Sequence, residues 1–181
     1  DVDPSEIIQD CLTVVRDLAT AQGIEILSPR SGGSNLVVRA DALRARQILL
    51  TLFTNAVRYN HTGGRVTIAV GNGTDGTIRI SIADTGIGIP EVDRPLVFEA
   101  FERGRETVDV EGTGIGLTVA RHLAKSMGGE IGFESKKGDG TTFWLELPAA
   151  DLASPENGPG SGPESGPGSM NGENEDTVKT D

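Results

Sequence analysis

The sequence predicts a two-layer α/β (α+β) sandwich for residues 1–148, in which helices cover one face of a mixed, mostly antiparallel sheet. Two observations predict this class. Three stretches carry apolar residues at intervals of three and four positions, which is the spacing of one buried helix face. Four β-branched runs form two pairs, joined by glycine-containing turns at residues 72–76 and 137–140, which is typical of antiparallel hairpins.

The first helix is expected to begin in the segment Asp3-Pro4-Ser5-Glu6. Asp3 can cap the helix, Pro4 suits its first turn, and Glu6 can complete a capping box. Gly23 ends its apolar stripe, which contains Ile7, Ile8, Cys11, Leu12, Val15 and Leu18. The other predicted elements are short strands at 24–27 and 36–38, a long helix at 41–59, strands at 65–70 and 77–83, a helix at 117–127, and strands at 130–135 and 141–147.

The composition changes near residue 149. The chain has 181 residues and a net charge of −11, and residues 149–181 hold seven acidic residues, one Lys and no aromatic residue. Such a segment buries too little apolar surface to offset the entropy of ordering, so we expect a disordered acidic Gly/Pro/Ser-rich tail. It is either a linker to a further domain or a solubilising terminus.

Composition also restricts the function of residues 1–148. A single cysteine excludes an internal disulfide, and no apolar run approaches the length of about 20 residues that a membrane span needs. The body is weakly acidic, which argues against nucleic-acid binding. We therefore expect a cytoplasmic domain without membrane contact, and, because the chain opens at Asp1 without a Met, a fragment of a longer protein.

The helix at 41–59 has a polar face made of Gln47, Thr51, Asn55 and Arg58. Thr and Asn are poor helix formers, and an exposed face usually prefers Lys and Glu. The face is either ordinary solvated surface or one side of a ligand site, where the Asn55 amide and the Arg58 cation meet a metal and phosphates.

Asp84 follows a strand in which Ile78, Ile80 and Ile82 alternate. A carboxylate at the end of a buried strand is costly unless something satisfies it, and an exocyclic amine such as that of adenine would suit. Gly86 and Gly88 have no Cβ, so the chain can turn sharply there and a flat ring can approach. By itself the motif also fits an ordinary strand-to-loop turn.

A second glycine loop, at residues 112–117, precedes the helix at 117–127. Unpaired N–H groups and the positive dipole end at a helix N-terminus commonly hold phosphates. The pattern is neither a P-loop nor a dinucleotide fingerprint, because Leu117 stands where the latter needs a third glycine. The irregular stretch of about 30 residues between the two glycine loops, with one short helical piece near 95–101, is typical of a functional lid.

In this order and spacing, the motifs resemble the ATP-binding catalytic domain of sensor histidine kinases, within the gyrase, Hsp90, histidine kinase and MutL superfamily. Residues 54–59 resemble the N box, 84–88 the first glycine box, 98–103 the F box, 112–117 the second glycine box and 138–143 the closing glycine motif. The resemblance covers residues 1 to about 148 and implies a Bergerat-type fold that binds ATP and Mg²⁺.

The resemblance also implies roles for individual residues. Asn55 would coordinate Mg²⁺, Arg58 would contact phosphate, and Arg103 would reach the γ-phosphate when the lid closes. Tyr59 would lie against the nucleotide, and Asp84 would accept from the adenine amino group. The other implied nucleotide-binding residues are Gly86 and Gly88 around the base, Gly112, Gly114, Gly116 and Leu117 on the phosphate side, and Thr142, which would close the site.

One position departs from the family pattern. A turn before Asn55, histidine kinases commonly have a second Asn, and ATP-hydrolysing relatives have a Glu that activates water. Thr51 stands there in this chain. A Thr can ligate a metal but cannot act as that general base, so an efficient ATPase is disfavoured.

The implied function is that of a protein-histidine kinase in two-component signalling. The domain would donate the γ-phosphoryl group to a histidine on a separate dimerisation domain, and a response regulator receiver domain, in the same chain or another, would follow. Neither His61 nor His122 has the sequence context of a phosphoacceptor. The alternatives are a non-catalytic nucleotide-binding relative, a serine kinase of the anti-sigma type, and an ATP-driven clamp.

Overall fold

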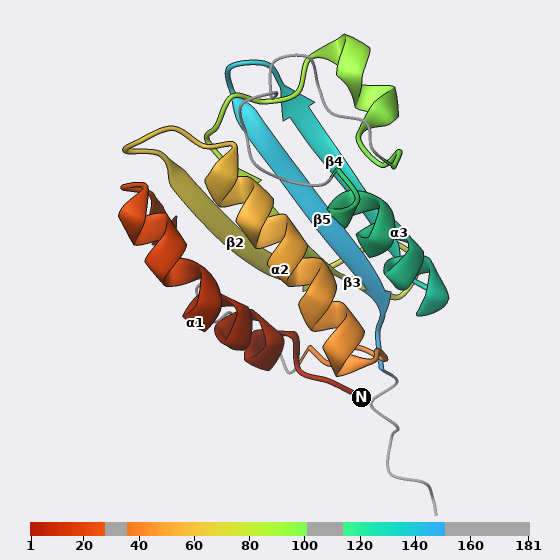
Figure 1. The fold of residues 1–181 in the computed structure, drawn as a ribbon. Coiled ribbons are helices and arrows are strands. Elements are labelled where there is room, and N and C mark those ends of the chain that lie inside the picture. The colour runs from red at the N-terminus through yellow and green to blue at the C-terminus, as the bar shows by residue number, and fades with distance from the viewer. Residues whose placement is uncertain (28–35, 101–113, 151–181) are drawn as a thin grey trace, which may run out of the picture.

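A computed structural model describes residues 1–27, 36–100 and 114–150. Its strands form one sheet in the order β1-β2-β3-β5-β4 (Figure 1). Only β1 and β2 pair in parallel, and the other neighbouring strands are antiparallel, so the predicted mixed, mostly antiparallel sheet is confirmed. The strands are β1 (Glu25–Leu27), β2 (Arg65–Asn72), β3 (Thr77–Asp84), β4 (Glu130–Lys136) and β5 (Gly140–Pro148).

Three helices, α1 (Pro4–Ala21), α2 (Ala42–Arg58) and α3 (Gly116–Ser126), cover one face of this sheet, with α2 between the other two (Figure 1). Asp3 caps α1 by accepting the N–H of Ser5 at 2.7 Å, and Asp41 caps α2 by accepting that of Arg44 at 3.0 Å. These bonds satisfy N–H groups that have no partner inside the helix. The predicted two-layer arrangement is therefore confirmed.

The core lies between the helices and the sheet. On β3, Ile78, Ile80 and Ile82 are buried, whereas Arg79 and Ser81 on the opposite side of the strand are half-buried. This alternation is the period of a strand with one covered face. From the helix layer, large apolar side chains such as Leu49, Leu52 and Phe53 complete the core.

Two predicted elements differ in the structure. Residues 36–38 form no strand, because Val38 makes only isolated bridges, one to Val2 and one to Ala149, in the segments that flank α1 and β5. The short helical piece is a 3-10 helix, η1 (Glu91–Leu96), which begins earlier than predicted because Pro90 sets its N-terminal boundary and two acidic residues occupy its first turn.

The packed domain continues two residues beyond the predicted boundary at 148. The N–H of Ala149 donates to the carbonyl of Gly76 at 3.0 Å, and that of Ala150 donates to the carbonyl of Val37 at 2.8 Å. Ala150 is also buried. These two hydrogen bonds attach the residues after β5 to the turn before β3 and to the segment before α2.

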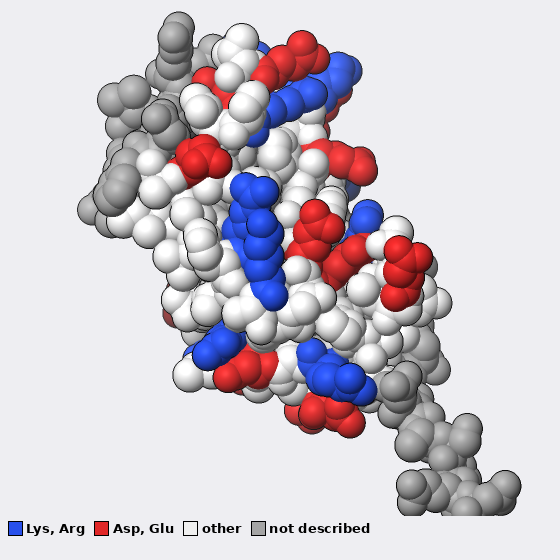
Figure 2. Space-filling model, turned by 90° about the vertical axis from the view of Figure 1, so that its right-hand side faces the viewer, with Lys and Arg blue, Asp and Glu red and all other residues white. Residues whose placement is uncertain are grey.

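The face of the molecule that carries α3 is drawn in Figure 2. Basic and acidic side chains are interspersed across the part of it that the structure describes. None of the helices among the described residues is long and apolar enough to cross a membrane.

Candidate nucleotide-binding site

Asp84 is a buried carboxylate at the end of β3 and is 9% exposed. Its Oδ1 accepts the backbone N–H of Gly86 at 2.8 Å and that of Thr141 at 3.2 Å. Burial raises the pKa of the Asp84 carboxyl from 3.8 to about 6, although the two N–H bonds act in the opposite direction. Both bonds go to Oδ1, and Oδ2 takes part in neither. A carboxylate of this kind is a candidate functional group.

The first glycine loop passes between the end of α2 and the β4–β5 turn. A Cβ at Gly86 would collide with the carbonyl oxygen of Tyr59, and a Cβ at Gly88 would collide with that of Lys136. Gly88 also has a φ of +67°, which disfavours other residues. The two glycines thus admit the neighbouring backbone of Tyr59 and Lys136.

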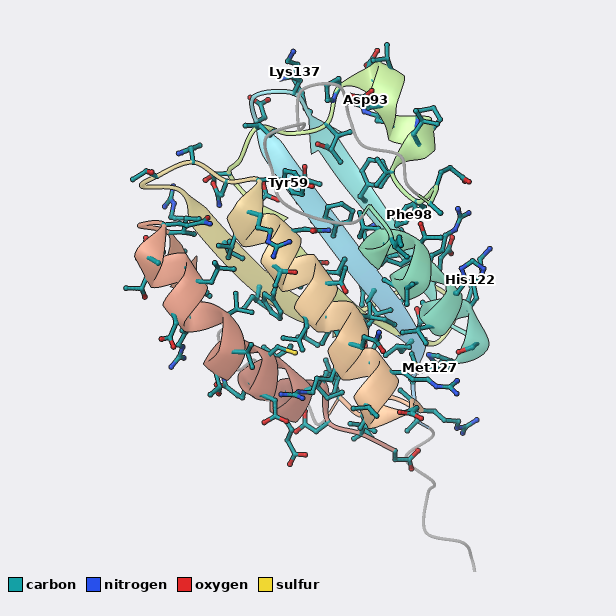
Figure 3. The ribbon with its side chains drawn as sticks, viewed as in Figure 1. Tyr59, Asp93, Phe98, His122, Met127 and Lys137 are labelled. Carbon is teal, nitrogen blue, oxygen red and sulfur yellow. The ribbon has the colours of Figure 1, made fainter. Side chains whose placement is uncertain are left out.

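Backbone bonds hold this loop on both sides. The N–H of Ile87 donates to the carbonyl of Tyr59 at 3.1 Å, and the carbonyl of Ile87 accepts from Gly138 at 2.7 Å. Figure 3 shows Tyr59 at the C-terminal end of α2, at the same end of the molecule as Lys137 in the β4–β5 turn and Asp93 in η1. The first glycine box and the end of the N box therefore meet, as their assignment to one site requires.

On α2, Thr51, Asn55 and Tyr59 follow one another at intervals of four residues and share one helix face. Asn55 and Tyr59 are half-buried, and Arg58 is exposed. Thr51 lies beside the start of α3, since a Cβ added at Gly116 would be 3.1 Å from its Cγ2 atom. The polar face of α2 thus adjoins the second glycine loop.

The N-terminus of α3 is suited to an anion. Gly114 has a φ of +71°, Gly116 begins the helix, and no described side chain caps it. Among the described residues, no side chain thus caps the N–H groups of the first turn, and free N–H groups at a helix N-terminus commonly bind phosphates. Leu117 is half-buried and packs against the core. Two other predicted residues, Gly112 and Arg103, lie outside the described residues.

The described part of the F box connects this helix to the sheet. The rings of Phe98 and Phe133 are 5.8 Å apart, and those of Phe133 and Phe143 are 5.7 Å apart. The hydroxyl of Thr118 on α3 donates to the carbonyl of Phe98 at 3.0 Å. Figure 3 shows Phe98 next to α3. The segment after η1 is therefore fixed between α3 and β4.

On β5 the structure brings Thr141 to Asp84, and not Thr142. Thr141 is paired with Asp84 in the sheet register and its side chain is buried. Thr142 is paired with Ala83, and successive residues of a strand point to opposite faces. The structure therefore places Thr141 beside Asp84, as the strand alternation that starts from buried Phe143 indicates, and the role predicted for Thr142 stays a prediction.

The polar face of α2 also borders a groove of about 440 Å³, lined by Leu43, Arg46, Gln47, Leu50, Thr51 and Thr54. The hydroxyl of Thr51 donates to the carbonyl of Gln47 at 3.0 Å, within the same helix. Gln47 is exposed. The N-terminal part of the polar face is thus solvated surface, and only its C-terminal part, from Thr51 onward, approaches the glycine loops.

The residues fit a Mg²⁺–nucleotide complex better than a metal alone. The described residues contain no group of three or more His, Cys, Asp or Glu side chains that could hold a metal ion. Mg²⁺ is commonly held by one or two protein ligands together with waters and substrate phosphates. A single amide at Asn55, one turn after Thr51 on the helix face that adjoins the start of α3, is compatible with that arrangement.

The arrangement of fold and site defines a nucleotide-binding domain of the two-layer type. Residues 40–151 match the family described as histidine kinase-, DNA gyrase B- and HSP90-like ATPase. The chain belongs to this family. It is homologous to the ATP-binding catalytic domains of sensor histidine kinases, which act in two-component signalling.

Several relatives support this assignment. The sensor protein GacS of Pseudomonas syringae pv. syringae is 35% identical over 147 residues, which cover 78% of this chain and 16% of that protein. The mycobacterial sensor histidine kinase MprB has a TM-score of 0.71 at 27% identity, covering 82% of this chain and 97% of its own. Full-length ShkA, solved in complex with AMPPNP, has a TM-score of 0.71 at 34% identity. The match covers 85% of this chain and 32% of the ShkA chain.

The chain spans between 16% and 20% of the length of the first curated relatives it matches. This chain therefore corresponds to a part of each of those relatives.

Proposed function

We propose that this domain binds Mg²⁺-ATP and donates the γ-phosphoryl group to a histidine on a separate dimerisation and phosphoacceptor domain. The observation that supports the proposal most directly is the buried carboxylate of Asp84, held by two backbone N–H groups at the edge of the first glycine loop. This carboxylate would accept a hydrogen bond from the adenine amino group through Oδ2.

The phosphate chain would extend from the base toward the N-terminus of α3. There the N–H groups after Gly114 and the positive end of the helix dipole would neutralise negative charge. Asn55 and Arg58 would contact the phosphates from α2, and Arg103 would contribute a second cation from outside the described residues. Mg²⁺ would be held by Asn55 together with the phosphates, and it supplies charge neutralisation in phosphoryl transfer.

Catalysis in this scheme is mainly positioning. A phosphoryl group leaves ATP for an imidazole nitrogen with little covalent participation by the domain that holds the nucleotide. Thr51 has no carboxylate to activate water, and its hydroxyl is engaged with the Gln47 carbonyl, which favours transfer over hydrolysis.

The phosphoacceptor would lie elsewhere in the protein. His61 is exposed in the loop after α2, where its Nδ1 lies 3.2 Å from the carbonyl oxygen of Thr62. His122 is exposed on α3, and its Nδ1 lies 2.9 Å from the carbonyl oxygen of Thr118. We assign neither as the acceptor. A receiver domain of a response regulator would take the phosphoryl group in the next step, in the cytoplasm.

Incubating the full-length protein with γ-labelled ATP tests this function. Phosphate that is labile to acid and stable to base, mapped to a histidine outside this domain, is the expected product. Acid-stable phosphoserine would contradict the histidine kinase and favour a serine kinase. Nucleotide binding without any transfer would contradict it in favour of a non-catalytic relative.

A further inference from the structure

The hydroxyl of Ser135, near the end of β4, connects three segments that surround Asp84. Its oxygen accepts the N–H of Ile89, just after the first glycine loop, at 2.8 Å. It donates to the carbonyl of Gly140 at 3.0 Å, and it lies 2.8 Å from the hydroxyl oxygen of Thr141. A single half-buried side chain thus joins the glycine loop, β4 and the start of β5.

These contacts use the full capacity of the Ser135 hydroxyl, which has one proton and two acceptor positions. The proton goes to the Gly140 carbonyl, so both acceptor positions remain, for the Ile89 N–H and the Thr141 hydroxyl proton. The Thr141 hydroxyl is therefore a hydrogen-bond partner of Ser135. The backbone carbonyl of Ser135 adds a fourth bond, because it accepts from Nη2 of Arg94 in η1 at 2.6 Å.

The geometry around Asp84 depends on the same segments. Oδ1 of Asp84 is held by the N–H of Gly86, from the glycine loop, and by the N–H of Thr141, from β5. Ser135 bonds to both segments, at Ile89 and at Thr141, so it fixes the position of one donor relative to the other. The nearby bond between Gly138 and Ile87 is made by backbone alone and does not include Thr141.

We propose that Ser135 is a positioning residue for the base pocket, where its hydroxyl fixes the glycine loop against β5 and so sets the orientation of the Asp84 carboxylate toward the adenine base. This inference rests on the proposed function, because that function assigns Asp84 to the base. Ser135 itself contacts neither base nor phosphate in this assignment.

Removing the hydroxyl tests the inference. Ser135→Ala leaves the Ile89 N–H and the Gly140 carbonyl without this partner. We expect ATP affinity, measured by titration calorimetry at a temperature where circular dichroism shows a folded chain, to fall about tenfold, as for loss of one ordinary hydrogen bond.

Two further variants separate positioning from general destabilisation. Ser135→Thr keeps the hydroxyl on a residue that strands favour, and we expect ATP affinity within about threefold of the parent, which is less than one hydrogen bond. Ser81→Ala is a matched control, since Ser81 is also a half-buried strand serine but lies on the opposite face of the sheet. We expect it to bind ATP like the parent.

The outcomes are distinguishable. If the parent binds ATP and S135A binds equally well, the inference on Ser135 fails while the proposed function stands. If S135T loses as much affinity as S135A, the hydroxyl is not the cause and the inference also fails. If the parent binds no adenine nucleotide, the proposed function fails and the inference fails with it.

A fourth variant covers the case in which S135A does not fold. Ser135→Cys keeps a weak donor and a weak acceptor at the same position. A folded S135C chain with weaker ATP binding than the parent supports the inference, and one with parental affinity overturns it.

Discussion

The side chain of Asp84 and the backbone amide of Thr141 are 57 positions apart in the chain, and a 3.2 Å hydrogen bond joins them where β3 and β5 are paired. The second bond to Asp84, from Gly86, is also donated by a neutral backbone group. Neutral donors offset only part of the cost of burying a carboxylate, so its pKa stays raised. The fold thus maintains a buried carboxyl whose ionised form lowers the stability of the domain at neutral pH.

The first prediction concerns the titration of this carboxyl. We expect the Asp84 side chain of the nucleotide-free chain to titrate near pH 6, followed by its ¹³C carboxyl shift in NMR. Because the folded state holds this proton more tightly than the unfolded state, Asp84 makes the free energy of unfolding fall as pH rises from about 4 to about 6. Titration near pH 4 would show that the carboxyl is solvated.

The second prediction separates the stability of the domain from its binding. In Asp84→Asn the amide oxygen can still accept from Gly86 and Thr141, but no charge is buried. At pH 8 we expect the free energy of unfolding of the variant to exceed that of the parent by up to about 3 kcal/mol, which follows from the raised pKa of Asp84.

The same variant should lose ATP binding in titration calorimetry, because a donor group replaces the proposed acceptor of the adenine amine. Retention of ATP affinity within a few-fold of the parent would show that the base lies elsewhere.

A third prediction addresses the metal. Asn55→Ala should remove the enhancement of nucleotide affinity by Mg²⁺, because Asn55 is the proposed protein ligand, and should leave the circular dichroism spectrum unchanged. Titrations with ATP in the presence of Mg²⁺ and of EDTA measure the effect. Gln47→Ala is a suitable control, since Gln47 is an exposed amide on the same helix, two turns earlier. An undiminished Mg²⁺ effect in N55A would place the ligand elsewhere.

Local sequence patterns predicted most of the fold. The cap at Asp3, the apolar stripes and the two glycine-containing hairpin turns each depend on residues close together in the chain, and the structure confirms them. The prediction of a strand at residues 36–38 was wrong. The pairing of Val38 depends on the distant residues Val2 and Ala149, and with each of them it forms only an isolated bridge.

The site was less predictable for the same reason. Asp84 was identified from its place after an alternating strand, but its partner Thr141 comes from a strand that the sequence does not place beside β3. The resemblance gave a role to Thr142 and none to Thr141, and only the register of β3 with β5 shows that Thr141 lies beside Asp84. Ser135 carries no local signal, since its role arises only where the glycine loop meets the β4–β5 turn.

The fourth prediction concerns the contact between α2 and α3. Gly116→Ala would place a Cβ 3.1 Å from Cγ2 of Thr51, which is closer than side chains normally approach. We expect G116A to destabilise the domain by about 1 kcal/mol, and Thr51→Ser to relieve most of that loss because it removes the methyl group. A double-mutant cycle of unfolding free energies measures the coupling. Additive effects of the two changes would show that the helices do not meet there.

The fifth prediction concerns the sheet face opposite the helices. Glu146 is buried there and accepts from Arg79 at 2.7 Å and from Thr74 at 3.1 Å. Burial raises the pKa of Glu146, but the hydrogen bonds together lower it by more than burial raises it, so the pKa lies below its usual value. Glu146 therefore adds stability at neutral pH that is lost as pH falls through its lowered pKa.

Glu146→Gln should lower the free energy of unfolding by about 1 kcal/mol at pH 7, a modest value because Arg79 is about a third exposed and solvent screens the pair. Arg79 also stacks on Trp144, the single tryptophan, at 4.4 Å, so tryptophan emission reports the change during urea unfolding. Glu134→Gln, at an exposed position of β4, is the control and should leave the free energy of unfolding unchanged.

ATP affinity should stay at the parental value in E146Q, because this face lies across the sheet from Asp84. A loss of ATP affinity in parallel with the loss of stability would mean that the two faces are coupled.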